Sequence, residues 1–204
     1  MKNRIVACVG MKGSGKSVMF TRLLLDCPRI LVYDVLNEHR WCANTVYDLE
    51  ELEEFMRECH RLPRFCVRLV PTYAGEEFEP FAAFAMRCYG VVVGFEEIPA
   101  FTTASSMPRE FERLVLQGRH RALSFCFTGQ RFAEMPRTLT AQCDAFVIFG
   151  TYEPGDLHAI ETRCGSEFRR EIEKLHAHEA LVYEIRDRRW YKADTESVRG
   201  LLIP

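Results

Sequence analysis

The chain has 204 residues, which is enough for one α/β domain with a full core and short for two. Its 48% hydrophobic content is ordinary for a globular protein, and its formal net charge of −2 provides no basic field for binding nucleic acid. No run of about 18 apolar residues and no signal peptide is visible, so we expect one domain (residues 1–204) without a transmembrane segment.

The most specific motif comes near the start of the chain. Residues 4–9 are apolar and typical of a strand, residues 10–17 read G-M-K-G-S-G-K-S, and residues 18–25 indicate a helix. The middle segment fits the phosphate-binding pattern G-x-x-x-x-G-K-[ST], and a strand before it with a helix after it is the context that this pattern requires. The sequence therefore predicts binding of a nucleoside triphosphate with Mg²⁺.

The residues of this loop suit a triphosphate for separate reasons. The glycines permit backbone angles that turn N–H groups toward an anion, and the following helix contributes its positive N-terminal end. Lys16 is predicted to reach the β- and γ-phosphates and the Ser17 hydroxyl to bind Mg²⁺. The predicted nucleotide-binding set is Gly10, Met11, Lys12, Gly13, Ser14, Gly15, Lys16, Ser17 and Val18. The motif alone does not distinguish an ATPase, a GTPase and a small-molecule kinase.

Strand and helix patterns alternate along the rest of the chain. The predicted strands cover residues 29–34, 65–70, 89–95, 122–128 and 145–149, and a hairpin pairs residues 180–185 with 190–193. The predicted helices cover residues 48–61, 76–88, 109–119, 137–143, 153–163 and 167–175. This alternation predicts an α/β fold with a mainly parallel sheet and helices on both faces.

Polar residues follow several of these strands, where ligands bind in open parallel sheets. Glu96 and Glu97 follow an apolar strand, and we expect Glu96 to hold Mg²⁺ through its water shell and Glu97 to activate the attacking water. Asp is more usual at the first position, which leaves the division of labour between the two glutamates open. Gln130 is a candidate sensor of the γ-phosphate, and Asp34 with Glu38 forms D-x-x-x-E. The simpler interpretation of each is a solvated loop residue.

A basic segment, residues 118–121 (G-R-H-R), precedes the strand that ends at Gln130. A guanidinium group offsets charge on transferring phosphates, so Arg119 is our candidate for an arginine finger that acts on a neighbouring subunit. Arg121 is the nearest alternative and Arg131 a weaker one. A basic helix end that complements the helix dipole would explain the same residues.

The nine cysteines include no C-x-x-C pair, and several lie in apolar strand-like runs. We therefore expect reduced thiols that pack as small hydrophobic residues in an intracellular protein. A zinc site can be drawn from His39, Cys42, Cys59 and His60, but its spacing matches no common zinc finger.

Taken together, these motifs resemble the FtsK–HerA superfamily of DNA-pumping ATPases over residues 4–185. The most specific part runs from the basic turn at residue 118 through T-G-Q-R at 128–131 to M-P-R-T-L at 135–139 and Q-C-D at 142–144. The sequence departs from the family pattern where Gly129 is inserted and where Phe132 replaces a common proline. Among these proteins, the compact chain is most similar to the genome-packaging ATPases of membrane-containing, double-jelly-roll viruses such as tectiviruses.

The resemblance implies a RecA-like core that hydrolyses ATP with Mg²⁺ and moves double-stranded DNA, commonly as a hexameric ring. It also implies partners at a capsid vertex or viral membrane, and a location in the host cytoplasm or the virion. Two alternatives stay open: a P-loop kinase of a small molecule, and a nucleotide-gated assembly module with negligible turnover. Stimulation of phosphate release by duplex DNA would separate the first alternative from a translocase.

Overall fold

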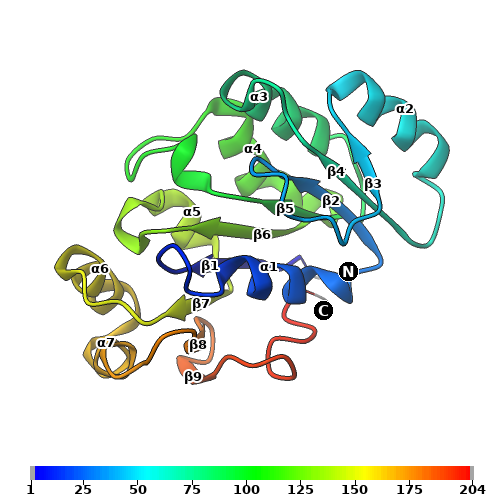
Figure 1. Cartoon of the computed structure of the whole chain (residues 1–204). Helices are drawn as coiled ribbons and strands as arrows, with labels where there is room; N and C mark the ends of the chain where they lie inside the picture. The colour runs from blue at the N-terminus through cyan, green and yellow to red at the C-terminus, as the bar shows by residue number, and fades with distance from the viewer. Residues whose placement is uncertain (1–2, 203–204) are drawn as a thin grey trace.

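The computed structural model describes residues 3–202, which form one nine-stranded sheet with helices packed against it (Figure 1). The strands lie in the order β3-β4-β2-β5-β6-β1-β7-β8-β9. Their bounds are β1 Ile5–Val9, β2 Arg29–Tyr33, β3 Asn44–Val46, β4 Phe65–Leu69, β5 Val92–Phe95, β6 Ser124–Gly129, β7 Ala145–Phe149, β8 Ala180–Glu184 and β9 Arg189–Lys192.

The helices follow the strands as the alternating pattern predicted. The α-helices are α1 Lys16–Leu25, α2 Leu49–Cys59, α3 Ala74–Ala85, α4 Arg109–Gln117, α5 Arg137–Gln142, α6 Pro154–Cys164 and α7 Ser166–Glu173. Three short 3₁₀ helices, η1 Ile98–Ala100, η2 Gly118–Arg121 and η3 Phe132–Glu134, join them to the sheet. None of the helices in residues 3–202 combines the length and the apolar character that crossing a bilayer requires.

The strands from β3 to β7 all pair in parallel, and the hairpin β8–β9 adds two antiparallel strands at one edge. β1 lies between β6 and β7, with Val9 level with Gly129 on one side and with Ile148 on the other. The carboxyl ends of β1, β5 and β6 therefore reach the same edge of the sheet, which we call the carboxyl edge. The opposite edge is called the amino edge.

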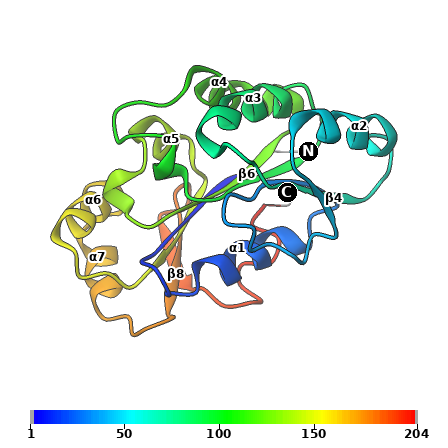
Figure 2. The same cartoon turned by 45° about the horizontal axis from the view of Figure 1, so that its top comes forward.

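Two apolar cores cover the two faces of the sheet. Figure 2 shows α1 on one side of the sheet and α3 and α4 on the other. One core receives side chains from α2 to α7, including Phe78, Phe111 and Phe168. The other packs Phe20 and Leu24 of α1, together with residues 198–202, against the strands. The prediction of helices on both faces is confirmed, although α1 is the one α-helix of the described residues that contributes to the second core.

Strand β5 approaches α1 closely because of a glycine. A Cβ atom on Gly94 would lie 2.6 Å from the Phe20 ring and 3.0 Å from Leu24. The absence of a side chain at Gly94 thus lets the helix after the phosphate-binding loop rest directly on the strand that leads to Glu96 and Glu97.

The structure also differs from the sequence-based expectations in two places. The three-residue strand β3 was not expected, because Asn44–Val46 is too short to show a period-2 pattern. The expectation that all cysteines are free thiols was wrong at one pair: Cys42 and Cys66 form a disulfide, with Cα atoms 5.6 Å apart. The other seven cysteines are free, and five of them are buried as expected. Cys42 is thereby removed from the zinc site considered above.

Candidate nucleotide-binding site

The phosphate-binding loop lies at the carboxyl edge, between β1 and α1. Gly13 and Gly15 have φ values of +79° and +100°, which side chains disfavour and glycine adopts freely. Gly10 has no room for a side chain, because a Cβ atom there would lie 2.5 Å from Ser14 Oγ and 2.8 Å from Phe149 Cβ. Met11, Lys12 and Val18 are exposed, so they can contribute to this loop through their backbone groups while their side chains face solvent.

Lys16 and Glu97 meet at this edge. The Lys16 Nζ atom lies 2.9 Å from Glu97 Oε1, and the two side chains are 9% and 14% exposed. An ion pair this sheltered from solvent is stronger than a surface pair, because fewer water molecules screen it. The structure therefore brings together the first residue of α1 and the second residue of the acidic pair, 81 positions apart by number (97 − 16).

The backbone at Glu97 is held in an unusual conformation. Its φ of +50° lies in the left-handed region, which costs a residue with a side chain roughly 1–2 kcal/mol. The Glu97 N–H donates a hydrogen bond of 2.8 Å to the hydroxyl of Thr128 on β6. Local strain that is held by a neighbouring strand is frequent at functional sites. Here it directs the Glu97 side chain back toward Lys16.

Glu96 is buried, and its two oxygens face the loop after β2. Oε2 accepts a hydrogen bond from the Leu36 N–H at 3.4 Å, and Oε1 lies 3.2 Å from His39 Nε2. From the same loop, Glu38 reaches α1, where the Ser17 hydroxyl donates to Glu38 Oε2 at 3.3 Å. The predicted Mg²⁺ residues Ser17 and Glu96 thus both contact the segment of residues 35–41, which we call the β2 loop.

Asp34 anchors the β2 loop at its start. Its carboxylate accepts the N–H groups of Glu38 and His39, both at 3.0 Å, and the guanidinium of Arg68 at 2.6 Å. Arg68 lies on β4 and also donates to the side chain of Asn37 at 2.6 Å. Three donors occupy the Asp34 oxygens, so this residue positions the loop rather than exposing a free carboxylate.

Gln130 follows β6 at the same edge and is exposed. The residue before it, Gly129, accepts a hydrogen bond from the Gly10 N–H at 3.1 Å, which places Gln130 beside the start of the phosphate-binding loop. A Cβ on Gly129 would lie 2.7 Å from Met135 Sδ and 3.2 Å from Pro99. The glycine that interrupts the family pattern therefore lets η1 and η3 close over the end of β6.

The candidate arginine fingers lie in different places. Arg119 and Arg121 belong to η2, which directly precedes β6, so they lie at the amino edge, away from the phosphate-binding loop of their own chain. Arg131 lies at the carboxyl edge, where it pairs with Asp156 at 2.8 Å and Glu153 at 3.1 Å. The hydrogen bond to Asp156 raises the pKa of Arg131. These ion pairs hold Arg131 against α6 of its own chain.

The residues present fit a magnesium–nucleotide complex. The hydroxyl of Ser14 is buried inside the loop without a hydrogen-bond partner among the described residues, as expected of a donor that is reserved for a ligand. Gly10 leaves a cradle that a Cβ would fill, and the positive helix end begins at Lys16. The oxygen donors nearby, Ser17, Glu38 and Glu96, are of the hard type that Mg²⁺ prefers.

Beside the loop is a hollow of about 250 Å³, lined by Met11, Phe149, Tyr152, Leu175 and His178 among others. The His178 ring contacts the Ser14 carbonyl oxygen at 3.2 Å. Beneath the loop lies Cys8, whose pKa is raised to about 12 by burial. The loop therefore has the uncharged thiol of Cys8 beneath it and the aromatic side chains of Phe149 and Tyr152 beside it.

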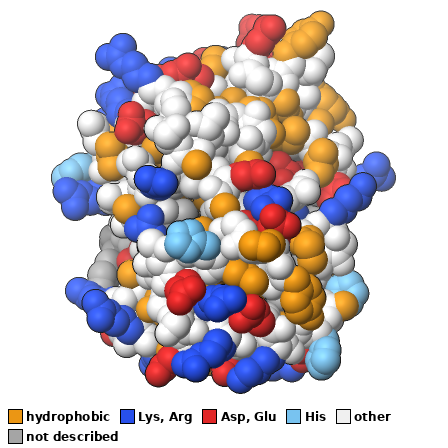
Figure 3. All heavy atoms as spheres, turned by 90° about the vertical axis from the view of Figure 1, so that its left-hand side faces the viewer, with side chains coloured by type: hydrophobic (Ala, Val, Ile, Leu, Met, Phe, Trp, Pro, Cys, Tyr) orange, Lys and Arg blue, Asp and Glu red, His pale blue; other side chains and the backbone are white. Residues whose placement is uncertain are grey.

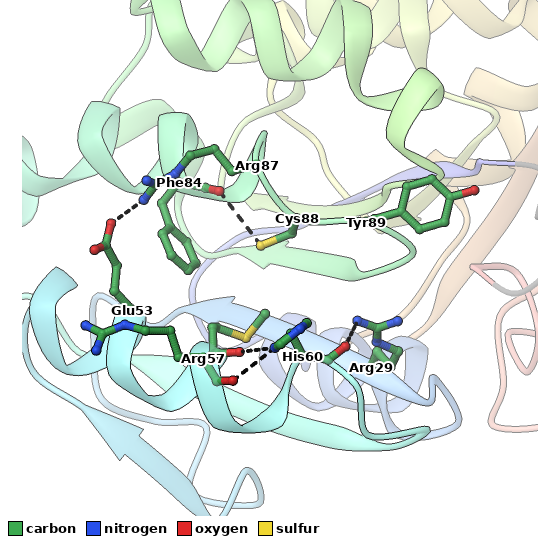
Figure 4. Close-up of a pocket in the computed structure, with 9 residues that line it drawn as sticks. Arg29, Glu53, Arg57, His60, Phe84, Arg87, Cys88 and Tyr89 are labelled. Carbon is green, nitrogen blue, oxygen red and sulfur yellow. Dashed lines mark hydrogen bonds and ion pairs between the residues drawn. The ribbon is translucent and has the colours of Figure 1, made fainter.

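A larger hollow lies at the amino edge, far from these residues (Figure 4). It measures about 570 Å³ and lies between α2 and the segment from α3 to β5. Figure 4 shows the side chains of Phe84, Cys88 and His60 facing it, with the ion pair of Arg87 and Glu53 across one end. None of the residues predicted to bind nucleotide lines this groove.

Figure 3 looks onto the left-hand side of Figure 1, where the loops of the carboxyl edge gather. Acidic, basic and apolar side chains are intermingled on this face, without one continuous basic field. This agrees with the net charge of −2, and this face therefore offers no continuous basic surface for binding nucleic acid by charge alone.

Solved structures similar to this fold include the genome packaging NTPase B204 of Sulfolobus turreted icosahedral virus 2 in complex with ATP-gammaS. The two chains are 17% identical with a TM-score of 0.79, and the match covers 94% of this chain and 97% of that one. This chain has the fold of a genome-packaging NTPase. No protein-family model and no curated protein sequence matches it.

Two further neighbours share the fold at greater distance. The conjugation coupling protein TcpA of pCW3 is 13% identical with a TM-score of 0.55, covering 98% of this chain and 65% of that one. EssC (ATPases 2 and 3) from Geobacillus thermodenitrificans is 12% identical with a TM-score of 0.55, covering 100% of this chain and 45% of that one. A viral genome packaging NTPase, a conjugation coupling protein and the EssC ATPases thus share this fold, which agrees with the resemblance stated above and confirms the RecA-like α/β fold class.

Sequence reasoning missed three residues of the site: His39, Arg68 and Thr128. Each acts on a predicted residue from another strand or loop, at a separation of 31 to 57 positions by number. Thr128 carried one signal, because it stands directly before the glycine and glutamine of the quoted motif. For His39 the sequence suggests only the zinc site that was considered above.

Proposed function

We propose that this protein is an ATP-hydrolysing translocase of double-stranded DNA, and that it is a subunit of a viral genome-packaging motor. The observation that carries the proposal is the sheltered pair of Lys16 and Glu97, 2.9 Å apart at the edge where the phosphate-binding loop and Glu96 also lie. The fold likeness to a genome packaging NTPase supports the packaging role.

In this proposal each residue has one task. The backbone of residues 10–18 and the Lys16 ammonium hold the phosphates, while Ser17 and Glu96 bind Mg²⁺ directly and through its water shell. When bound, the magnesium ion withdraws charge from the phosphate oxygens. Glu97 accepts a proton from the attacking water, and its contact with Lys16 directs the carboxylate toward the phosphate-binding loop. Gln130, beside Gly10, senses the γ-phosphate through a hydrogen bond to it or to that water.

The remaining positive charge would come from a second subunit. Arg119 lies at the amino edge, so it can only serve the nucleotide of a neighbouring chain, as in a ring. Arg121 is the alternative, whereas Arg131 is engaged by Glu153 and Asp156. A homo-hexameric ring is the assembly that the family resemblance favours, with a capsid vertex or viral membrane protein as docking partner and a host-cytoplasmic or virion-associated location.

The test is phosphate release by the purified full chain, measured with and without duplex DNA, with ring formation followed by light scattering in ATP. We expect several-fold stimulation by duplex DNA. A rate that is indifferent to DNA but rises with a small acceptor would favour the kinase alternative. Rings that form in ATP with negligible single-turnover hydrolysis would favour the assembly module.

Glu97→Gln gives the sharper test of mechanism. The amide cannot accept a proton, so we expect ATP binding to persist while single-turnover hydrolysis falls about 10²- to 10⁴-fold. Glu134→Gln is the matched control, because Glu134 is exposed on η3 near the same edge. Full activity of the Glu97 variant would remove this residue from the proposed role.

A further inference from the structure

His39 is a buried polar residue that the proposed mechanism does not use. It is 1% exposed, it lies in the β2 loop, and its Nε2 atom is 3.2 Å from Glu96 Oε1. Nε2 is at the same time a buried polar atom without a hydrogen-bond partner among the described residues. The 3.2 Å separation is within hydrogen-bond reach, so Glu96 Oε1 is an acceptor available to it.

The other ring nitrogen decides which tautomer is present. The indole N–H of Trp41 donates to His39 Nδ1 at 3.4 Å. An indole nitrogen is a donor only, so Nδ1 is the accepting nitrogen and Nε2 carries the ring proton. His39 thus presents an N–H group to Glu96. Within the cluster of ligating groups formed by Asp34, His39 and Glu96, the ring therefore faces the carboxylate as a donor.

Three further contacts fix the ring in this place. The His39 N–H is bound by Asp34 at 3.0 Å, and Asp34 is in turn held by Arg68 of β4. The imidazole packs on Phe20 of α1 with ring centroids 4.8 Å apart. The loop that carries His39 is therefore tied to β4 on one side and to the helix of the phosphate-binding loop on the other.

We propose that His39 is the positioning residue of Glu96: its Nε2–H, fixed by Trp41, orients the Glu96 carboxylate toward the magnesium water shell. Leu36 N–H supplies the second donor, at 3.4 Å from the other oxygen. One N–H group thus lies beside each carboxylate oxygen, and the pair fixes the direction in which the carboxylate points. The same contacts compensate for the extra methylene of glutamate, since they fix a side chain that is longer than the usual aspartate.

This inference rests on the proposed function and deepens it. Partners of this kind around a metal-binding carboxylate typically change metal affinity 10- to 100-fold when they are removed. The test measures the dissociation constant of Mn²⁺ for the full chain in the presence of ADP, by electron paramagnetic resonance, together with the Mg²⁺ dependence of hydrolysis. Binding of a fluorescent ADP analogue without divalent metal monitors the phosphate-binding loop separately.

His39→Leu removes the donor and should weaken Mn²⁺ binding at least about tenfold, with metal-free ADP binding unchanged. His39→Gln places an amide N–H near the Nε2 position and should restore binding to within about threefold. Trp41→Phe keeps the ring but frees its tautomer, and should give a loss between these two. His158→Leu is the control, because His158 is exposed on α6.

The inference is overturned if His39→Leu binds Mn²⁺ as the native chain does, or if His39→Gln is impaired as strongly as His39→Leu. Should His39→Leu fail to fold, the comparison of His39→Gln with Trp41→Phe decides in the same way: equal affinities overturn the proposal. Failure of the proposed function gives a different result: phosphate release by the native chain would then be indifferent to duplex DNA, whatever the Mn²⁺ affinities of the His39 variants.

Discussion

The two edges of the sheet carry charged residues in opposite ways. At the carboxyl edge, Lys16, Asp34 and Glu96 are buried and contact one another's segments. At the amino edge, the ion pair of Arg87 and Glu53 is 65% and 44% exposed beside the hollow of about 570 Å³. Burying charge is unfavourable unless it is paired, so a fold keeps such groups only where they are satisfied or useful. Buried, paired charged side chains are therefore a better guide to the candidate site than the volume of a hollow.

The strongest test of this comparison is Lys16→Ala. The substitution removes a buried ammonium that faces Glu97 and leaves that carboxylate without its partner. We expect ATP hydrolysis to fall at least about 10²- to 10³-fold, the size of effect seen when one charge-stabilising donor is lost. Phosphate release measured at saturating ATP, with binding of a fluorescent nucleotide in parallel, checks this.

Lys174→Ala is the matched control, since Lys174 is 68% exposed at the end of α7 and pairs with Glu171. Its activity should stay within about twofold of the native chain, because exposed ion pairs contribute little. Equal activity of the Lys16 and Lys174 variants would contradict the assignment of the carboxyl edge as the site.

A second comparison concerns Cys8 and Cys88, one at each edge, and their effect on how stability depends on pH. Burial raises the pKa of Cys8, under the phosphate-binding loop, to about 12, and that of Cys88, in the groove, to about 11. A thiol whose pKa is raised in the folded protein does not reduce the free energy of unfolding at pH values below its ordinary pKa of 9.0. Above that pH the unfolded chain loses the proton first, so the free energy of unfolding falls as the pH rises.

For either thiol the loss between pH 8 and pH 10 is about 1.4 kcal/mol. Urea unfolding of Cys8→Ala and Cys88→Ala at these two pH values should therefore show a shallower decline than the native chain. The two variants should diverge only above pH 11, where Cys88 ionises in the folded protein and Cys8 does not. A native chain equally stable at pH 8 and pH 10 would contradict the prediction.

The smallest effect is expected from the groove itself. Arg57→Ala removes a guanidinium that lines the hollow, at the opposite edge from Lys16. Hydrolysis without DNA should stay within about twofold of the native rate, since the residue touches none of the nucleotide-binding set. A loss comparable to that of Lys16→Ala would show that the larger hollow, rather than the buried pair, governs turnover.

The sequence was sufficient for those parts of the site that are encoded in contiguous residues. The loop from Gly10 to Ser17 and the pair Glu96–Glu97 were recognisable because a strand, a short polar segment and a helix follow one another directly. No local sequence pattern gives the order of the strands in the sheet, so the sequence does not show which carboxyl ends of strands are neighbours. The meeting of Lys16 with Glu97 followed only from the general rule that ligands bind at the carboxyl ends of parallel strands.

The residues that hold the predicted site residues in place could not be predicted from the sequence, because their contacts also depend on the order of the strands. Arg68 resembles any charged residue in a strand until β2 and β4 are known to pair, which places it beside Asp34. The role of His39 can be inferred only when the positions of Trp41 and Glu96 around its ring are known. The Cys42–Cys66 disulfide likewise depends on how the segment after the β2 loop lies against β4.

Phe20 joins all of these segments. Its ring fills the place where a Gly94 side chain would be, two residues before Glu96, and it packs at a tilt against the ring of His39 in the β2 loop. One aromatic ring thus sets the spacing between the helix that begins at Lys16, the strand that ends at the acidic pair, and the loop that holds them. A methyl group added at position 94 would push the Phe20 ring and, with it, α1. The distance between Lys16 and Glu97 therefore depends on packing on the apolar side of the sheet.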